Sequence, residues 1–193
     1  MAGGRPREFD IDKALDRALD VFWEHGYEGT SLTQLTTAMG VGRSSMYATF
    51  GSKDELFGKV LDRYYLGDAA YTAAALKEPT IRDVARKYLH RNVDAITNPD
   101  HPRGCLVVGS ALRCSPENSA IAADLAERRR ATTQALQDRF EQGRLDGDTT
   151  LTLSPAELAQ YISTISEGLS VRAATGVSRE ELHTIVDVSL RTL

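Results

Sequence analysis

The sequence predicts an all-α protein in which an N-terminal three-helix helix-turn-helix domain precedes a larger C-terminal helical bundle, with about nine helices in total. Apolar residues recur at helical spacing along most of the chain, and several helix starts carry a serine-based cap. Strand patterns are weak, since only Thr149–Leu153 alternates, within a loop rich in glycine and aspartate. Ten of the 13 aromatic residues lie between residues 9 and 71, and this shift in composition indicates two units joined near residues 67–80.

The first helix is expected over residues 10–25, because its apolar positions share one helical face. These positions are Ile11, Leu15, Ala18 and Phe22. Gly26 is expected to end this helix, since glycine readily adopts the left-handed backbone of a helix C-cap. The later helices are expected over residues 32–38, 44–49, 53–68, 80–97, 105–113, 116–142, 155–175 and 179–192.

Four of the later helices begin with a capping box, in which a serine and a Glu or Gln three residues further on each satisfy a backbone N–H group. The four serines are Ser31, Ser52, Ser154 and Ser178. Pro155 follows Ser154 at the first helical position, where the N–H group that proline lacks is not needed. These starts divide the chain into helices without any need for strands.

Length, charge and cysteine count exclude several classes of protein. The chain has 193 residues, which is enough to bury a hydrophobic core without metal ions or disulfides. Its net charge of −4 argues against a protein that coats nucleic acid non-specifically. No signal-peptide core precedes Asp12, and the longest nearly apolar run, Cys105–Leu112, is far shorter than the roughly 20 residues of a membrane span. Two cysteines, Cys105 and Cys114, make no disulfide framework, so we expect a cytoplasmic protein with no membrane partner.

The most informative segment covers residues 26–57. Its first short helix has Leu32, Leu35 and Met39 on the inner face, and Gly40–Val41–Gly42 then makes a tight turn. A second short helix follows from Arg43 to Phe50. A helix, a three-residue glycine turn and a second helix have the geometry of a helix-turn-helix motif, over residues 31–50.

The second helix of this motif separates into two faces at about 100° per residue. Met46 and Phe50 point to the core. The opposite face carries small residues, namely Ser44, Ser45 and Ala48. Small side chains would let the helix backbone enter the major groove of DNA closely.

Polar and basic side chains surround this small-residue face. Tyr47 and Thr49 flank it and can hydrogen-bond the phosphates of the two groove walls. Arg43, at the helix start, can reach a guanine edge with two hydrogen bonds. Lys53 opens the next helix, where its charge and the free N–H groups both suit a phosphate. The pattern predicts a surface that binds double-stranded DNA.

This segment resembles the TetR family of transcriptional regulators. The resemblance covers residues 8–68 and rests on Gly26, Tyr27, Ser31, Leu35, Gly40, Val41, Tyr47, Phe50, Lys53, Leu56 and Phe57 at the spacing of the family. It implies a homodimer with one recognition helix for each half-site of a pseudo-palindromic operator, and a C-terminal ligand-binding bundle. The resemblance further implies that Thr33, Arg43, Ser44, Ser45 and Thr49 face bases or the groove, and that Ser31, Tyr47 and Lys53 contact phosphates.

The sequence departs from the family pattern at two positions. The family usually has Ser or Thr where Gly42 stands, so the recognition helix has a weaker N-cap, at a cost of about a few tenths of a kcal/mol. Thr36 stands where a small alanine is common. Neither departure breaks the pattern.

We divide the chain into three segments. Residues 1–7 form a basic arm with Arg5 and Arg7. This segment resembles the arms by which other proteins reach the minor groove of DNA, and a solvated tail without a DNA contact is an equal alternative. Residues 8–68 form the DNA-binding domain. Residues 69–193 form the ligand-binding and dimerisation domain, in which the resemblance implies that the last two helices pair with those of a second protomer. The residues expected at that interface are Leu158, Ile162, Ile165, Leu169, Leu182, Ile185, Val186 and Ser189.

An unknown small-molecule effector is expected in the central bundle, and its binding would shift the dimer away from the operator-binding spacing. Candidate residues for this pocket are Tyr88, Cys105, Phe140 and Tyr161. The favoured function is therefore a transcriptional repressor that a small molecule releases from DNA.

Two alternative functions would involve different chemistry, namely a reactive thiol or a bound metal ion. Cys105 follows Arg103 and precedes a helix, and both would lower the pKa of its thiol, as in a redox or electrophile sensor; the other interpretation is a buried apolar residue. A helical metal-dependent enzyme is the remote alternative. It has little support, because Glu180 and His183 form one Glu-x-x-His pair where a di-iron bundle needs two. No phosphate loop, nucleophile elbow or paired-cysteine motif occurs, so we expect no catalytic residue, no metal and no cofactor.

Overall fold

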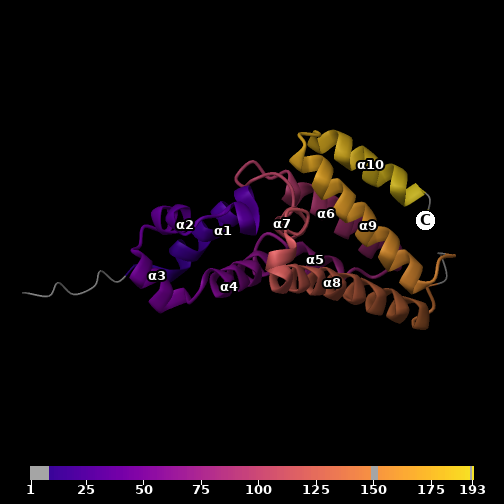
Figure 1. Ribbon diagram of the computed structural model, residues 1–193. Coiled ribbons are helices and arrows are strands. Elements are labelled where there is room, and N and C mark those ends of the chain that lie inside the picture. Colours follow the sequence, from indigo (N-terminus) through magenta and orange to yellow (C-terminus); the bar gives the residue numbers. More distant parts are fainter. Residues whose placement is uncertain (1–8, 149–151, 192) are drawn as a thin grey trace, which may run out of the picture.

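The computed structural model describes residues 9–148, 152–191 and 193, and it is all-helical over these residues, which contain no strand (Figure 1). This confirms the predicted fold class. The arm that carries Arg5 and Arg7 lies outside the described residues, as do residues 149–151 of the weak strand pattern. The helices are α1 (Ile11–Gly29), α2 (Leu32–Met39), α3 (Arg43–Phe50), α4 (Lys53–Leu66), α5 (Tyr71–Ala75), α6 (Ile81–Ile96), α7 (Leu106–Ala111), the 3₁₀ turn η1 (Pro116–Asn118), α8 (Ser119–Leu145), α9 (Pro155–Ala174) and α10 (Arg179–Arg191).

All nine predicted helices are present in the described part of the chain, and the structure adds the short helix α5. The sequence gives no start signal for α5, because its N-cap is Ala70 and no side chain caps it. Gly26 breaks the helical backbone of α1 where the sequence predicts the helix to end, and the chain makes one further turn to Gly29. Its φ is 71°, but its ψ of 175° lies outside the left-handed helical region expected of a C-cap.

The four predicted capping boxes are all formed. The Ser31 hydroxyl accepts the Gln34 N–H at 3.2 Å while the Gln34 side chain accepts the Ser31 N–H at 2.8 Å. The same reciprocal bonds begin α4, α9 and α10. Since such a cap stabilises a helix by about 1 kcal/mol, local sequence alone fixes where these four helices begin.

Two hydrophobic cores fill the molecule, one at each end of the view in Figure 1. The first core lies among helices α1, α2, α3 and α4 and is rich in aromatic rings. We call it the aromatic core. Its fully buried rings include Phe22, Phe50 and Phe57. The second core joins α6, α8, α9 and α10 and is largely aliphatic, and we call it the aliphatic core.

The two cores meet along a seam formed by α4, α5 and α7. Tyr71 and Cys105 pack against both cores. The aromatic core also continues past the expected domain boundary, because it contains Leu106 of α7 and Leu125 of α8. At the seam the indole Nε1–H of Trp23 donates to the Gly104 carbonyl oxygen at 3.1 Å, and this bond is buried. This bond connects the seam directly to α1.

Candidate DNA-binding surface and central cavity

The turn between α2 and α3 depends on a glycine. Gly40 has φ of 70° and ψ of 29°, the left-handed conformation that glycine adopts without steric cost. Its N–H group donates to the α2 carbonyls of Thr36 and Thr37, which ends that helix. The Val41 N–H also donates to the Thr36 carbonyl, at 3.1 Å. These bonds set the angle at which α3 leaves α2.

Helix α3 is anchored by its inner face. Met46 and Phe50 are fully buried in the aromatic core, as the helical angles predict. The Phe50 ring also contacts the Phe9 ring, with centroids 6.2 Å apart. At its start α3 has Gly42 as N-cap and no side-chain cap bond, as expected from glycine at this position.

The outward face of α3 carries the predicted small residues. Arg43, Ser44 and Ala48 are exposed, and Ser45 and Thr49 are half-buried. Tyr47 stands beside them with 47% of its surface exposed, which is unusual for an aromatic residue in this aromatic-rich domain. The face is therefore smooth enough for close approach and has a phenol at its flank.

Two of the predicted DNA-contacting side chains already touch. The Arg43 guanidinium donates from Nη2 to the Thr33 hydroxyl at 3.0 Å, which links the start of α3 to α2. This bond lies on the exposed surface, so DNA can compete for the guanidinium. Ser31 is exposed at the start of α2, with its hydroxyl engaged in the capping box.

Lys53 is held at the start of α4. Its ammonium lies over the ring of Tyr27, 4.2 Å from the centroid, and partial burial lowers the pKa of Lys53. The Tyr27 hydroxyl donates to Asp54, the next residue along α4. The capping box of Ser52 with Glu55 orients the free N–H groups of the same helix start. A phosphate at this point would meet a positioned cation and helix N–H groups.

Helices α1 and α4 are fastened to each other on the surface. The Arg63 guanidinium donates to both carboxylate oxygens of Asp16, at 2.9 and 3.1 Å, and to Asp12 at 3.3 Å. A two-point arginine–carboxylate pair resists rotation better than a single contact. Displacement of α4 would therefore carry α1 with it.

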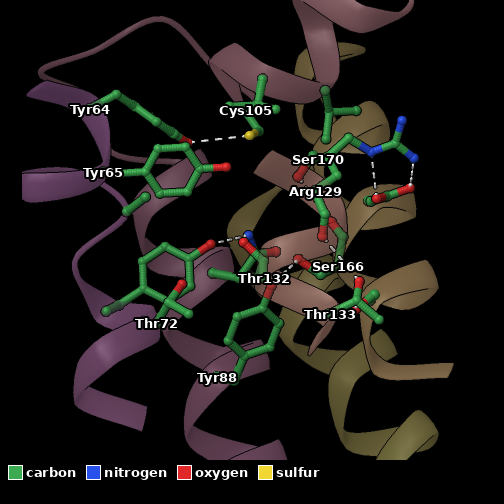
Figure 2. Close-up of a pocket in the computed structure, with 17 residues that line it drawn as sticks. Tyr64, Tyr65, Thr72, Tyr88, Cys105, Arg129, Thr132, Thr133, Ser166 and Ser170 are labelled. Atoms are coloured by element: carbon green, nitrogen blue, oxygen red, sulfur yellow. Dashed lines mark hydrogen bonds and ion pairs between the residues drawn. The ribbon is translucent and has the colours of Figure 1, made fainter. Parts of the chain in front are cut away.

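A small cavity of about 50 Å³ lies at the seam between the two cores (Figure 2). Side chains from α4, α5, α6, α8 and α9 surround it, together with Cys105 at the start of α7. Hydroxyl groups dominate the wall, including those of Tyr64, Tyr88 and Ser166. The wall is completed by Tyr65, Ala69, Tyr71, Thr72, Asn92, Cys105, Val107, Val108, Arg129, Thr132, Thr133, Ser163, Glu167 and Ser170.

The tyrosines of this cavity are neutral at physiological pH. Burial raises the pKa of Tyr88 to about 12 and holds the pKa of Tyr64 and Tyr71 well above its ordinary value. A neutral phenol both donates and accepts hydrogen bonds. The Tyr88 hydroxyl lies 3.4 Å from the Ser166 hydroxyl.

The structure corrects the expectation that the Cys105 thiol has a lowered pKa. Burial raises the pKa of Cys105, and the hydrogen bond that its sulfur receives from the Tyr64 hydroxyl, at 3.3 Å, offsets this only in part (Figure 2). Arg103 points elsewhere, since its Nε donates to the Ala173 carbonyl at 3.0 Å. A thiol with a raised pKa is mostly protonated and reacts slowly. Although Cys105 is only half-buried by its accessible surface, its raised pKa therefore does not favour a thiol sensor.

The four candidate effector residues separate into two groups. Tyr88 and Cys105 line the cavity. Phe140 is fully buried within the aliphatic core, and the Tyr161 hydroxyl donates to the Ser189 carbonyl at 3.4 Å; neither lines the cavity. The sequence analysis missed Asn92, although a signal was present: Asn92 occupies a position in the otherwise apolar inner stripe of α6.

Five of the eight residues expected at the dimer interface face the monomer interior instead. Each is at most 1% exposed in the aliphatic core, because the apolar stripes of α9 and α10 pack inside the chain. These residues are Leu158, Ile162, Leu169, Leu182 and Val186. Ser189 is also buried, whereas Ile165 and Ile185 are half-buried. The exposed apolar residues of these helices are Val171, at 40%, and Val188, at 51%.

Two further features bear on the class of protein. No helix in residues 9–148 and 152–191 has the length and apolarity to cross a membrane. Within the same residues, no three His, Cys, Asp or Glu side chains gather as they would to bind a metal ion. His183 is instead engaged in the α6–α10 contact, 2.8 Å from the His90 ring and 3.2 Å from Asp94.

A helix-turn-helix motif with an exposed small-residue face, joined to a helical bundle with a central cavity, defines a DNA-binding regulator. The sequence model described as "Bacterial regulatory proteins, tetR family" matches residues 14–60. The HTH-type transcriptional repressor ComR of Escherichia coli K12 is 35% identical, over 97% of this chain and 90% of ComR.

Solved structures agree with this assignment. A cysteine mutant of the TetR family transcriptional regulator CifR, in complex with 26-base-pair operator DNA, is 41% identical with a TM-score of 0.91, over 97% of this chain and 98% of that one. A TetR-type regulator from Rhodococcus sp. RHA1 is 38% identical with a TM-score of 0.63, over 95% and 98% of the two chains. The chain belongs to the TetR family, so it is a DNA-binding transcriptional regulator and not an enzyme.

Proposed function

We propose that this chain is a homodimeric, cytoplasmic repressor that binds a double-stranded DNA operator and is released by a small molecule in the seam cavity. The outward face of α3 carries the proposal, because it combines small exposed residues with a flanking phenol. Ser44, Ser45 and Ala48 allow close approach to the major groove, and Tyr47 stands at the flank. The CifR complex with operator DNA and the repressor name of ComR support the same function.

The expected DNA contacts fall into two groups, those to base edges and those to phosphates. Arg43 and Thr33, which share a hydrogen bond at 3.0 Å, would separate to contact base edges, together with Ser44, Ser45 and Thr49. Contacts to phosphate come from Ser31, Tyr47 and Lys53, and Arg5 and Arg7 would reach the adjacent minor groove. Phosphate contacts fix position and base contacts fix sequence preference, so the two groups of variants are expected to behave differently.

Dimerisation would use the outer face of α9 and α10. Val171 and Val188 are exposed there, and Thr164 and Gly168 on the same face of α9 are small enough to let helices approach. Half-buried Ile165 and Ile185 would complete their burial on association. A two-fold dimer matches a pseudo-palindromic operator with two equivalent half-sites.

Release follows from where the cavity lies. Its wall includes Tyr64 and Tyr65 of α4, and Arg63 of the same helix ties α4 to Asp16 of α1. We expect a molecule larger than the cavity to displace α4, which forms one side of the wall, and α4 would carry α1 with it. Binding would thus favour a dimer in which the two recognition helices no longer match the operator spacing.

The test is a salt-titrated binding assay on the DNA immediately upstream of the coding sequence, with unrelated DNA as the comparison. Arg43→Ala is expected to lose about 1–3 kcal/mol of preference for the operator. Lys53→Ala is expected to weaken binding to all DNA and to reduce the salt slope by about 1. Lys87→Ala is the matched control, since it removes the same charge from α6, where Lys87 pairs with Glu78.

Two results would contradict the proposal. One is an unchanged affinity and salt slope in Lys53→Ala, which would show that α4 does not contact phosphate. The other is equal affinity for upstream and unrelated DNA, followed by failure to enrich any sequence from genomic fragments with ligand-stripped protein. Sedimentation of the free protein as a monomer at micromolar concentration would contradict the dimer alone.

A further inference from the structure

We propose that the seam cavity selects an uncharged molecule with a hydrogen-bond donor beside an acceptor, such as a carboxamide or an alcohol, and that Asn92 is its anchor. This inference rests on the proposed role of the cavity as the effector site and names the chemical class of that effector. It is drawn from the hydrogen bonding and the charges of the cavity wall (Figure 2).

The first observation is a buried acceptor without a partner. Asn92 is 2% exposed and lines the cavity from α6. Its Nδ2–H donates to the Tyr71 hydroxyl at 2.8 Å, but its Oδ1 atom has no hydrogen-bond partner within the described part of the chain. Buried polar atoms are nearly always paired, and leaving one unpaired costs free energy. A donor on a bound molecule would satisfy this oxygen.

The second observation concerns the neighbour of Asn92. The Tyr71 hydroxyl accepts the amide N–H, and a phenol has one proton of its own to donate. An acceptor placed next to the donor of the bound molecule would receive that proton. A carboxamide offers this pair of groups on adjacent atoms, with N–H toward Asn92 and C=O toward Tyr71, and an alcohol offers both on one oxygen.

The third observation is that the wall carries no unbalanced charge among the lining residues that the structure describes. Arg129 and Glu167 are its charged members, and they pair with each other through two hydrogen bonds of 2.7 and 2.6 Å. The phenols and the Cys105 thiol are neutral because burial raises their pKa. A charged molecule would lose its hydration without gaining a counter-ion.

Size limits the probes for this site. The cavity of about 50 Å³ is smaller than the roughly 150 Å³ that accommodates benzene in an engineered protein. The probes are therefore three of the smallest molecules that carry these groups, with four non-hydrogen atoms each, and the other two each differ from acetamide in one property. Acetamide has a donor and an acceptor, acetone has only the acceptor, and acetate is charged.

The experiment titrates each probe into the full-length protein at pH 7.5 and follows binding by saturation-transfer NMR. Acetamide is expected to bind at least about tenfold more tightly than acetone or acetate, the difference that one hydrogen bond supplies. Asn92→Leu replaces the amide by two methyl groups, which removes the acceptor and adds bulk to the cavity wall. Because this bulk acts on acetamide and acetone alike, the ratio of their affinities is the readout, and acetamide is expected to bind within about twofold of acetone. Tyr71→Phe keeps the ring and is expected to weaken acetamide by a smaller factor, which tests the same site if Asn92→Leu does not fold.

The matched control is Ser166→Ala, which changes a hydroxyl of the same wall that already lies 3.4 Å from the Tyr88 hydroxyl. It is expected to keep the preference for acetamide. Tighter binding of acetate would overturn the proposal, because Arg129 would then act as the anchor. Equal binding of acetamide and acetone would also overturn it, and would mean that a buried water satisfies Asn92.

Operator binding is measured separately, so that the two proposals fail in different ways. If acetamide binds with the expected preference but larger amides never weaken operator binding, the selectivity of the cavity stands and the release mechanism fails. If larger carboxylates release the operator and amides do not, the release mechanism stands and the assignment of Asn92 fails.

Discussion

The aromatic core and the part of the chain that follows α5 differ in how completely their buried polar atoms are hydrogen-bonded. In the aromatic core the Phe22 and Phe57 rings meet at 4.9 Å and the Tyr27 and Phe57 rings at 5.1 Å. By contrast, the four buried side-chain atoms without a hydrogen-bond partner in the described residues lie after α5, two on helices α6 and α8 of the aliphatic core and two near the seam, beside α1. They belong to Asn92, His101, Ser110 and Arg139. We therefore expect the DNA-binding unit to hold its shape, and the seam and the bundle to change more readily.

The largest expected effect comes from opening the aromatic core. Phe57→Ala removes a fully buried ring that contacts two others, and is expected to lower the free energy of unfolding by about 3–5 kcal/mol. Urea unfolding followed by far-UV circular dichroism measures the loss. Tyr47→Ala, at an exposed ring of the same domain, should change stability by less than about 0.5 kcal/mol. A loss below about 1 kcal/mol for Phe57→Ala would show that this core relaxes readily. It would contradict the proposed difference between the aromatic core and the rest of the molecule.

A smaller effect tests the seam between the cores. Trp23→Phe keeps an aromatic ring against Tyr64 but removes the N–H that bonds the Gly104 carbonyl. Leaving that buried carbonyl unpaired is expected to cost about 1–3 kcal/mol, measured by thermal unfolding. The same variant should retain operator affinity in the absence of effector and respond differently when effector is added. An unchanged response would mean that the seam transmits its motion through α4 alone.

The smallest effect concerns acid sensitivity, because the capping boxes of α2 and α9 differ. Helix α2 uses neutral Gln34, whereas α9 uses Glu157, whose pKa is lowered by hydrogen bonds from the Ser154 hydroxyl and N–H. Since its pKa is lower in the folded state, Glu157 stabilises the fold above the ordinary glutamate pKa of about 4.3, and this contribution disappears as the pH falls through the folded-state pKa.

Glu157→Gln is therefore expected to flatten the loss of stability as the pH falls below the ordinary glutamate pKa of about 4.3, and Gln34→Glu to steepen it. Denaturant midpoints at a series of pH values measure both slopes. Glu24→Gln, at a solvent-exposed glutamate of α1 outside any capping box, is the control. Identical slopes in all three variants would remove any role for the boxes in acid sensitivity.

Local signals in the sequence predicted the DNA-binding unit closely. Ser31, Gly40 and the inward pair Met46 and Phe50 act through bonds and contacts within a few residues, and the structure has them as predicted. Helix α5 escaped prediction because no side chain caps it. Where a capping residue or a glycine conformation decides the structure, sequence is sufficient.

Signals in the bundle are ambiguous because an apolar stripe does not reveal its partner. Leu158 and Leu182 fit a dimer interface and an internal core equally well, and they are internal. The Cys105 thiol shows the same limit: its neighbours in sequence favour a lowered pKa, but burial by distant helices raises it. Tyr71 and Asn92 come together across 21 positions of sequence, and only the fold reveals that pairing.

The chain contains a single tryptophan, and it lies at the seam. The indole of Trp23 is stacked on the His101 ring at 5.3 Å and packs edge-on against Tyr64, which lines the cavity. Its fluorescence therefore originates from one site, between the DNA-binding unit and the cavity at the seam. Trp23 is therefore a built-in optical reporter, and we expect its emission to change, without a label, when a molecule that enters the cavity displaces Tyr64.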